Sequence, residues 1–263
     1  MIIVKVGGGA DINLEGVVGD LAALDTPAVV VHGANALRDE IAERLGTPKT
    51  VITSVSGYSS VFSDASAIDA ILMSYSGLRN KRLVELCQRA GVNAIGLTGL
   101  DGAMVRGERN KGIRVREGGK NLIKRDFSGK PRTANEPLLR LLLDAGYTPV
   151  LTIPIVDEKG FAINSENDDI VNVLQESLNA EKIIQLIEAP GYLADANDPT
   201  SVIDAMSRDE VAMREAQEEG RIKRKLLALR RLLDSGAAEV IIADGRTEHP
   251  LADALAGQGT IIR

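Results

Sequence analysis

Short, continuously apolar segments alternate with amphipathic helical segments along this chain, and this alternation limits the possible folds more than any other feature. The apolar segments are IIVKV (2–6), AVVVHG (28–33), NAIGLTG (93–99), TPVLTIPIV (148–156), KIIQLIEA (182–189), EVIIAD (239–244) and GTIIR (259–263). Strands that helices cover on both faces are apolar throughout, whereas half-exposed strands alternate apolar and polar residues. We therefore predict a three-layer αβα sandwich with a mostly parallel central sheet.

The helical segments between these strands carry their own end markers. They include NALRDEIAERLG (35–46), LRNKRLVELCQRAG (78–91), EPLLRLLLDAG (136–146) and DDIVNVLQESLNA (168–180). Three of them end in glycine, the usual residue for a left-handed helix C-terminus. A soft boundary near residues 157–160 divides the chain into lobes of residues 1–160 and 161–263, which we expect to form a single domain.

Residues 106–132 break the alternation and hold most of the positive charge. The segment has ten Lys or Arg and three Asp or Glu, a net +7, while the rest of the chain carries −13. GIRVR (112–116) and NLIKRDF (121–127) flank the turn residues Glu117, Gly118 and Gly119, which predicts a β-hairpin. A basic segment on an acidic body indicates an acidic partner or substrate.

Composition argues against several other functional classes. Aromatic residues make up 3% of the chain and Trp is missing, which disfavours stacking platforms for nucleic acid. No apolar stretch approaches the roughly 18 residues that span a membrane, and the start lacks the pattern of a signal peptide. One cysteine rules out an internal disulfide, and two histidines leave little for a metal cluster. We expect a soluble cytoplasmic protein in which Cys87 and His32 are structural.

Glycine-rich turns follow several of the predicted strands: VKVGGGA (4–10), VHGANALRDE (31–40) and GLTGLDG (96–102). Such turns suit anions because exposed N–H groups and a helix N-terminus point at the ligand. Each turn alone is equally consistent with a tight strand–helix connection. Lys5 has two interpretations: an edge-strand lysine whose amine reaches water, or a charge directed at a phosphate beside Gly7 and Gly8.

A second lysine and an acid complete the candidate set. In EEGRIKRKLLALRRLLDSG (218–236), Ile222, Leu226, Leu229 and Leu233 form one apolar stripe, and Lys225 is the lysine beside it that can reach inward.

Upstream, in FAINSENDDIVNVLQESL (161–178), either Asp168 or Asp169 is expected at a helix start, where carboxylates are favoured. Simple capping is the alternative. An acid between two lysines would hold both of them oriented.

These features favour phosphoryl transfer, which needs alignment and charge neutralisation more than covalent help. A carboxylate acceptor is already ionised at pH 7, so the reaction requires no general base. Two unit negative charges at 4 Å repel by about 4 kcal/mol at an effective dielectric near 20. Two lysines and a set of N–H donors offset that repulsion best in the transition state.

With these motifs the chain resembles the amino-acid kinase superfamily, specifically its N-acetylglutamate kinase branch. The sequences VKVGG, VHG, GLTGLDG, AINSENDD, QLIEAPGYL and GRIKRKLLA follow one another in this order over essentially the whole chain. The stretch NKRLVELCQRAGVNAIGLTGLDG (80–102) and the basic hairpin after it are most similar to LysW-aminoadipate/LysW-glutamate kinases. Those enzymes phosphorylate a substrate carried on the acidic protein LysW.

The resemblance implies roles for individual residues. Lys5 and Lys225 would stabilise the transition state, and Asp168 would organise both. The implied substrate-binding residues are Gly33, Ala34, Asn35, Asn164 and Val61; the implied ATP-binding residues are Gly7, Gly8, Glu188, Gly191 and Tyr192; and the implied carrier-docking residues are Arg109, Lys111, Arg114 and Arg116. Magnesium would be held mainly by the ATP phosphates, residues 161–263 would bind ATP, and residues 1–160 the acceptor. A homodimer is also implied.

Two positions depart from the family pattern. Ala34 replaces a glycine, and Val61 stands where an arginine is expected to hold the substrate α-carboxylate. The residues that could compensate are Tyr58, Ser59, Ser60 and Arg79.

Three functions follow: a kinase for a carrier-linked amino acid, a kinase for free N-acetylglutamate, and a non-catalytic amino-acid or nucleotide-binding module. Docking on a basic hairpin would weaken steeply with salt, which separates the first from the second.

Overall fold

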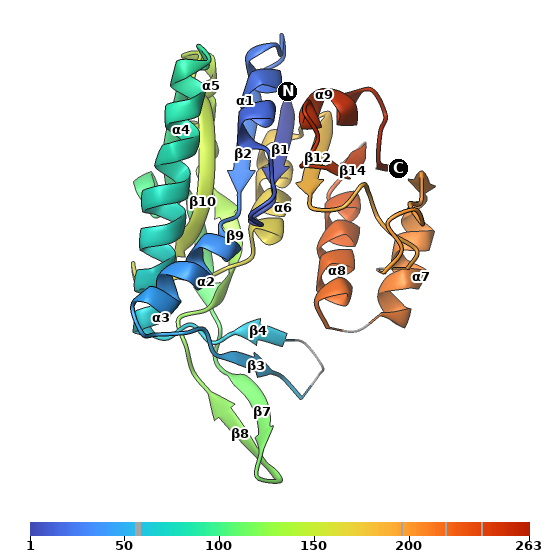
Figure 1. Ribbon diagram of the computed structural model, residues 1–263. Coiled ribbons are helices and arrows are strands. Elements are labelled where there is room, and N and C mark those ends of the chain that lie inside the picture. Colours follow the sequence, from blue (N-terminus) through green and yellow to red (C-terminus); the bar gives the residue numbers. More distant parts are fainter. Residues whose placement is uncertain (56–58, 196, 219, 238) are drawn as a thin grey trace.

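The computed structural model describes residues 1–55, 59–195, 197–218, 220–237 and 239–263 (Figure 1). Its helices are α1 (Leu14–Ala22), α2 (Asn35–Arg44), α3 (Ala65–Ile71), the π-helix η1 (Leu72–Arg79), α4 (Asn80–Arg89), the 3₁₀-helix η2 (Asp101–Ala103), α5 (Glu136–Asp144), α6 (Asn167–Leu178), α7 (Arg208–Gln217), α8 (Gly220–Asp234) and α9 (Pro250–Leu255). Its strands are β1 (Ile2–Val6), β2 (Ala28–His32), β3 (Val51–Thr53), β4 (Ser59–Val61), β5 (Ala94–Gly99), β6 (Val105–Arg109), β7 (Ile113–Glu117), β8 (Lys120–Lys124), β9 (Gly129–Ala134), β10 (Thr148–Val156), β11 (Ala162–Ile163), β12 (Lys182–Ile187), β13 (Ala205–Met206), β14 (Val240–Asp244) and β15 (Thr260–Ile262). None of the described helices is both long and apolar enough for a membrane crossing.

Within the described residues, one large sheet joins both halves of the chain. Its strand order is β13-β15-β14-β12-β1-β2-β10-β6-β9, and β5 and β11 also pair with β10. β1 runs parallel to β2 and β12, and β10 runs parallel to β2 and β5. Antiparallel pairs occur toward the ends, as between β14 and β15 or β6 and β9. The predicted mostly parallel sheet is therefore confirmed.

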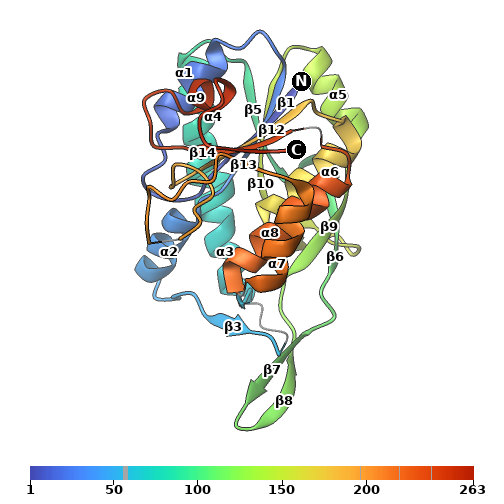
Figure 2. The same ribbon diagram turned by 90° about the vertical axis from the view of Figure 1, so that its right-hand side faces the viewer.

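Two buried clusters occupy the two faces of this sheet. Ile2, Val4 and Val6 of β1 pack with α1, α4 and α9, whereas Ile3 packs with the cluster that contains α6 and α8. Figure 2 shows α1, α4 and α9 on one side of the sheet and α5, α6 and α8 on the other. Because strand side chains alternate, Lys5 lies on the same face as Ile3, toward α6.

The basic segment is a two-part antiparallel ribbon. β6 and β9 pair at its base, and β7 and β8 form a separate hairpin further out. Gly118 and Gly119 connect β7 to β8 with φ of 57° and 77°. Positive φ at both loop residues is typical of the two-residue turns that close β-hairpins. The predicted hairpin is confirmed, and it projects beyond the ends of β1, β2 and β12 (Figure 1).

A second small hairpin, β3–β4, lies against the first. The Val55 N–H donates to the Arg114 carbonyl at 2.9 Å, and the Ser63 N–H donates to the Asp126 carboxylate at 2.9 Å. Residues 157–160, the expected lobe boundary, form the tight turn between β10 and β11, where the Asp157 carboxylate accepts two backbone N–H bonds.

Helix α8 differs in one respect from the expected apolar stripe. Leu226, Leu229 and Leu233 are buried, but Ile222 is 39% exposed. Arg231, in the last turn of α8, is level with the first turn of α6, where Asp169 lies 3.6 Å away. The C-terminal part of α8 lies along α6, so the first turns of α8 lie beyond the N-terminal end of α6, which does not cover Ile222.

Candidate active site

Lys5 of β1 is paired with Asp168 of α6. The Lys5 Nζ donates to the Asp168 Oδ1, and the two side chains are only 12% and 19% exposed. Partial burial weakens screening by water and salt, so the pair is held more firmly than a surface ion pair. The Lys5 side chain is directed over the carboxyl end of the sheet.

The structure distinguishes the two candidate acids at the start of α6. Both lie in the first helical turn after Glu166, which has an extended backbone and makes no side-chain cap. Asp168 contacts Lys5, whereas Asp169 lies 3.6 Å from the Arg231 guanidinium of α8. Burial raises the pKa of Asp169, and the Arg231 charge opposes that rise. Asp168 is thus the acid at the candidate site, and Asp169 joins α6 to α8.

Two glycine turns meet beside this pair. A Cβ on Gly8 would lie 2.6 Å from the backbone N of Ala34 and 2.7 Å from that of Asn35. A Cβ on Gly33 would lie 2.8 Å from the backbone N of Gly8. Both positions require glycine because the turns after β1 and β2 are in direct contact. The structure therefore brings together Gly8 and the Gly33–Asn35 turn, as expected.

The N–H groups of these turns are not equivalent. The Gly7 N–H donates to the Leu186 carbonyl and the Gly33 N–H to the Val6 carbonyl, both at 2.9 Å, so these two groups serve the sheet. The Gly8 N–H has no acceptor among the described residues. The Asn35 N–H likewise has no acceptor there, so Gly8 and Asn35 are donors of these turns that remain for an anion.

Glu188 covers the third glycine of the first turn. Its carboxylate fills the space where Gly9 would carry a Cβ, and its Oε1 accepts the Asp11 N–H at 2.8 Å. Further along the same loop, Gly191 is buried against Thr260, and the Tyr192 N–H donates to the Thr260 Oγ1 at 2.8 Å. The three expected ATP-binding residues after β12 therefore lie on one loop that spans from the first glycine turn to β15.

His32 is a structural residue at the end of β2. It is fully buried, and burial lowers its pKa to about 3, so the ring is neutral at physiological pH. Its carbonyl accepts hydrogen bonds from the Thr152 Oγ1 at 2.8 Å and the Asn167 Nδ2 at 3.0 Å. Asn167 thereby fixes the start of α6 against β2. Sequence reasoning missed this role, although the residue directly precedes Asp168.

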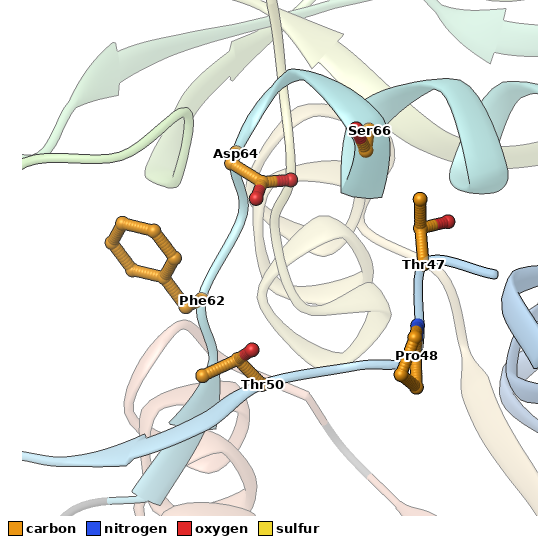
Figure 3. Close-up of a pocket in the computed structure, with 6 residues that line it drawn as sticks. All are labelled: Thr47, Pro48, Thr50, Phe62, Asp64 and Ser66. Carbon is orange, nitrogen blue, oxygen red and sulfur yellow. The ribbon is translucent and has the colours of Figure 1, made fainter.

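The expected acceptor residues lie on the hairpin side of the site. The Asn164 Nδ2 donates to the Ser63 Oγ at 2.9 Å, and its carbonyl accepts the Gly129 N–H. Val61 pairs with Val51 in the small hairpin. A hollow of about 180 Å³ near its base is a separate feature, lined by Thr47, Pro48, Thr50, Phe62, Asp64 and Ser66 (Figure 3).

Of the four residues that could compensate for Val61, Arg79 is the one whose side chain the structure describes. Its Nε and Nη2 atoms are buried and have no hydrogen-bond acceptor among the described residues. Burial lowers the pKa of Arg79, while the negative charge of Glu188 opposes that shift. Tyr58 lies outside the described residues, as do the side chains of Ser59 and Ser60.

Lys225 lies on the exposed side of α8. Lys225 precedes Arg231 by six residues, about 9 Å along the helix axis. Because Arg231 is beside the first turn of α6, Lys225 lies beyond the N-terminal end of that helix. Lys5 and Lys225 therefore lie on the same face of the sheet, and Lys225 is the more exposed of the two.

The four expected docking residues divide into two kinds. The Arg109 Nε donates to the Asp126 carbonyl at 2.8 Å, and its guanidinium lies 4.0 Å from the centre of the Phe127 ring. Lys111, Arg114 and Arg116 are exposed. Arg109 fixes the base of the ribbon, and the other three present their charge to solvent.

The site fits a bound phosphate in its charge and shape. Lys5 supplies a cation, the Gly8 N–H is an available donor, and the glycine turns leave the backbone accessible. In the part of the chain that the structure describes, no group of three or more His, Cys, Asp and Glu residues could hold a metal ion.

Comparison with known proteins gives a consistent family match. The model of the amino acid kinase family matches residues 1–244. LysW-aminoadipate kinase of Thermus thermophilus is 40% identical, and the alignment covers 100% of both chains. LysW-aminoadipate kinase of Deinococcus radiodurans is 38% identical over 100% of this chain and 91% of the relative. Acetylglutamate kinase of Methanopyrus kandleri is 29% identical over 100% of both.

Solved structures share the fold at low sequence identity. Giardia carbamate kinase superimposes with a TM-score of 0.69 at 13% identity, covering 99% of this chain and 97% of the other. The smu.665 protein of Streptococcus mutans gives a TM-score of 0.74 at 18% identity, with coverage of 99% and 97%.

Proposed function

This chain belongs to the amino acid kinase family, and we propose that it phosphorylates the side-chain carboxylate of aminoadipate or glutamate linked to an acidic LysW-type carrier protein. ATP is the phosphoryl donor. The bond between the γ-phosphorus and the β–γ bridging oxygen breaks, a carboxylate oxygen bonds to that phosphorus, and ADP leaves. The product is an acyl phosphate.

The observation that carries this proposal is the Lys5–Asp168 pair beside the contact of Gly8 with the Gly33–Asn35 turn. Lys5 neutralises charge on the transferring phosphoryl group, and the Gly8 N–H donates to one of its oxygens. Asp168 holds the Lys5 ammonium charged and directed. Preorganised donors of this kind each contribute roughly 100-fold to 1000-fold in rate.

Lys225 is the second proposed cation. Its position on the protruding turns of α8 suits the donor side of the phosphoryl group, where charge develops on the leaving ADP oxygen. The loop with Glu188, Gly191 and Tyr192 would border ATP, and Mg²⁺ would be held mainly by the ATP phosphates. In this assignment residues 161–263 bind ATP and residues 1–160 bind the acceptor.

The basic ribbon supports a carrier-borne acceptor. Lys111, Arg114 and Arg116 are exposed on it, and Leu122 and Ile123 of β8 are 43% and 64% exposed. Positive charge around exposed apolar side chains suits an acidic protein, because charge guides the encounter and apolar burial holds the complex. A free amino acid would need neither feature.

The second candidate is a kinase for free N-acetylglutamate, favoured by the 29% identity to acetylglutamate kinase over the whole chain. In either case Val61 cannot bind the acceptor α-carboxylate by charge. The Asn164 amide and the Arg79 guanidinium are the proposed replacements, since Asn164 donates to Ser63 on the hairpin side of the site and the charge of Glu188 acts on Arg79.

Hydroxylamine trapping of the acyl phosphate tests the function. Carrier-linked aminoadipate, carrier-linked glutamate and free N-acetylglutamate are incubated separately with ATP, Mg²⁺ and enzyme, and hydroxamate is measured. We expect product with a carrier-linked acceptor, suppressed by added salt. Product from N-acetylglutamate alone would select the second candidate, and none from any acceptor would leave the non-catalytic binding module.

We also propose a cytoplasmic homodimer. Met73 and Leu78 of η1 are each 43% exposed, which favours a helix-to-helix contact between two copies. Light scattering of the purified protein measures its mass; a monomer at micromolar concentration would contradict the dimer.

A further inference from the structure

A groove of about 450 Å³ lies along α6, away from the Lys5–Asp168 pair. Residues of α6, β9 and α8 line it, and α6 runs between the other two elements and contacts both of them (Figure 1). The lining residues are Lys130, Pro131, Arg132, Asp169, Asn172, Val173, Glu176, Arg231, Asp234 and Ser235. The candidate active site uses none of them.

The α6 wall presents a spaced series of polar groups. Asp169, Asn172 and Glu176 follow one another at intervals of three and four residues, so they lie on one helix face. Asp169 and Glu176 are two turns apart, about 10 Å along the axis. Asn172 between them is 7% exposed, and its Oδ1 is buried with no hydrogen-bond donor among the described residues. A buried amide oxygen without a donor is costly, so it indicates a missing partner.

Charge is distributed unevenly along the groove. At the Asp169 end, Arg231 lies 3.6 Å from the Asp169 carboxylate, and the Lys130 charge also acts on that carboxylate. Lys130 makes no ion pair within the described part of the chain. This end therefore has two cations for one acid.

The opposite end is acidic. Glu176 is exposed and has no ion-pair partner among the described residues. Asp234 lies 3.9 Å from Arg208 and 3.7 Å from Arg230, and Arg132 is paired with Glu108 at 2.7 Å. One cation, Lys130, and one acid, Glu176, are thus left unmatched at opposite ends.

We propose that this groove binds a free amino acid with a terminal amine, of the chemical class of L-lysine. The ligand carboxylate lies between Lys130 and Arg231, and the terminal ammonium lies at Glu176. An ammonium N–H donates to the Asn172 Oδ1, and the aliphatic stem packs on Val173. A ligand with adjacent charges only could not reach both ends, because Asp169 and Glu176 are two helical turns apart.

The site has a physical route to catalysis. A carboxylate bound at Arg231 competes with Asp169 for the guanidinium, and Asp169 is the neighbour of Asp168. Arg231 also belongs to the helix that carries Lys225. Occupancy therefore changes the contact between the two helices that hold the proposed catalytic groups, and we expect it to change the kcat of the enzyme.

Isothermal titration calorimetry of the full chain tests the binding without any need for activity. The probes are L-lysine, norleucine, which lacks the terminal amine, and cadaverine, which lacks the carboxylate. L-lysine is expected to bind at least tenfold more tightly than either analogue. Equal affinity for all three, or no heat with L-lysine, would overturn the proposal.

Variants locate the site. Lys130→Glu and Glu176→Lys, both at exposed positions, should each weaken L-lysine binding at least tenfold, and Asn172→Leu should do so if its melting temperature is retained. Lys159→Glu, a lysine reversal outside the groove, is the matched control and should bind normally. Lys5→Ala should also bind normally, which separates this site from the candidate active site. Binding that survives both groove reversals, or is lost with Lys5→Ala, would refute the assignment.

Discussion

Lys5 on β1 and Asp168 on α6 form an ion pair although 163 residues separate them in the chain. The pair is partly buried at the carboxyl end of the central strand of the sheet, where the glycine turns after β1 and β2 also meet. This is the position where ligands bind in open parallel sheets, because helix N-termini and strand ends converge there. The Lys5–Asp168 ion pair thus joins the N-terminal strand to the second half of the chain.

Replacement of Lys5 by alanine is expected to lower kcat at least 100-fold, because the transferring phosphoryl group would lose a cation that we propose to stabilise it. Circular dichroism and the melting temperature should show a folded protein. Lys49→Ala removes another lysine that pairs with an aspartate, on the exposed α2–β3 connection, and should leave kcat unchanged. Wild-type turnover in the Lys5 variant would disprove the mechanism.

Lys225 and Lys223 are a matched pair on the same helix. Lys225→Ala should reduce kcat at least 100-fold, since the leaving ADP oxygen would lose the cation that we propose for it. Lys223→Ala should retain activity within a factor of about two. Steady-state kinetics at saturating ATP provides the comparison, and equal effects of the two substitutions would remove Lys225 from the mechanism.

Gly8→Ala tests the contact between the two glycine turns. The new Cβ would lie 2.6–2.7 Å from the backbone of Ala34 and Asn35, so the turns must separate and the Gly8 N–H is displaced. We expect a loss of at least 100-fold in kcat/KM together with a lower melting temperature. Gly19→Ala is the control, because its Cβ meets nothing within 4 Å on the exposed face of α1; it should stabilise the fold by up to about 1 kcal/mol.

Charge reversal on the basic ribbon tests carrier docking. Arg114→Glu with Arg116→Glu should raise KM for a carrier-linked acceptor at least tenfold and leave kcat unchanged, because docking precedes chemistry. The wild-type KM should rise steeply between low and moderate salt, and the variant should lose most of that dependence. Lys159→Glu on the β10–β11 turn controls for overall charge. An unaltered KM in the double variant would argue against docking on the ribbon.

The pH dependence of stability depends partly on His249 at the start of α9. Its Nδ1 lies 3.0 Å from the Asp20 carboxylate, and this hydrogen bond raises the pKa of His249 above 6.5. A raised pKa adds stability that is complete below pH 6.5 and is lost as the pH rises through the folded-state pKa. His249→Ala should therefore melt below the wild type at pH 5.5, with a smaller difference at pH 9. A difference that is constant with pH would contradict the assignment.

The order of residues was sufficient to predict the layers of the fold and the positions at strand ends that carry chemistry. Continuous apolar runs identified β1, β2, β10, β12 and β14, because burial on both faces leaves no room for alternation. Two adjacent glycines between basic strands predicted the hairpin, since only glycine readily adopts the positive φ that both loop positions have. Lys5 was a candidate site residue because it is a charged residue inside a strand that is otherwise apolar.

Which of these residues lie together became known from the folded chain alone. Asp168 and Asp169 are equivalent in the sequence, and the packing of α8 against α6 assigned one to Lys5 and the other to Arg231. In the sequence Arg109 is indistinguishable from the other cations of the ribbon, but in the folded protein it contacts Asp126 and Phe127. The groove beside Asn172 is formed by three elements that are distant in sequence. Local patterns specify strands, helices and turns, but pairings between distant residues depend on how the assembled layers place them.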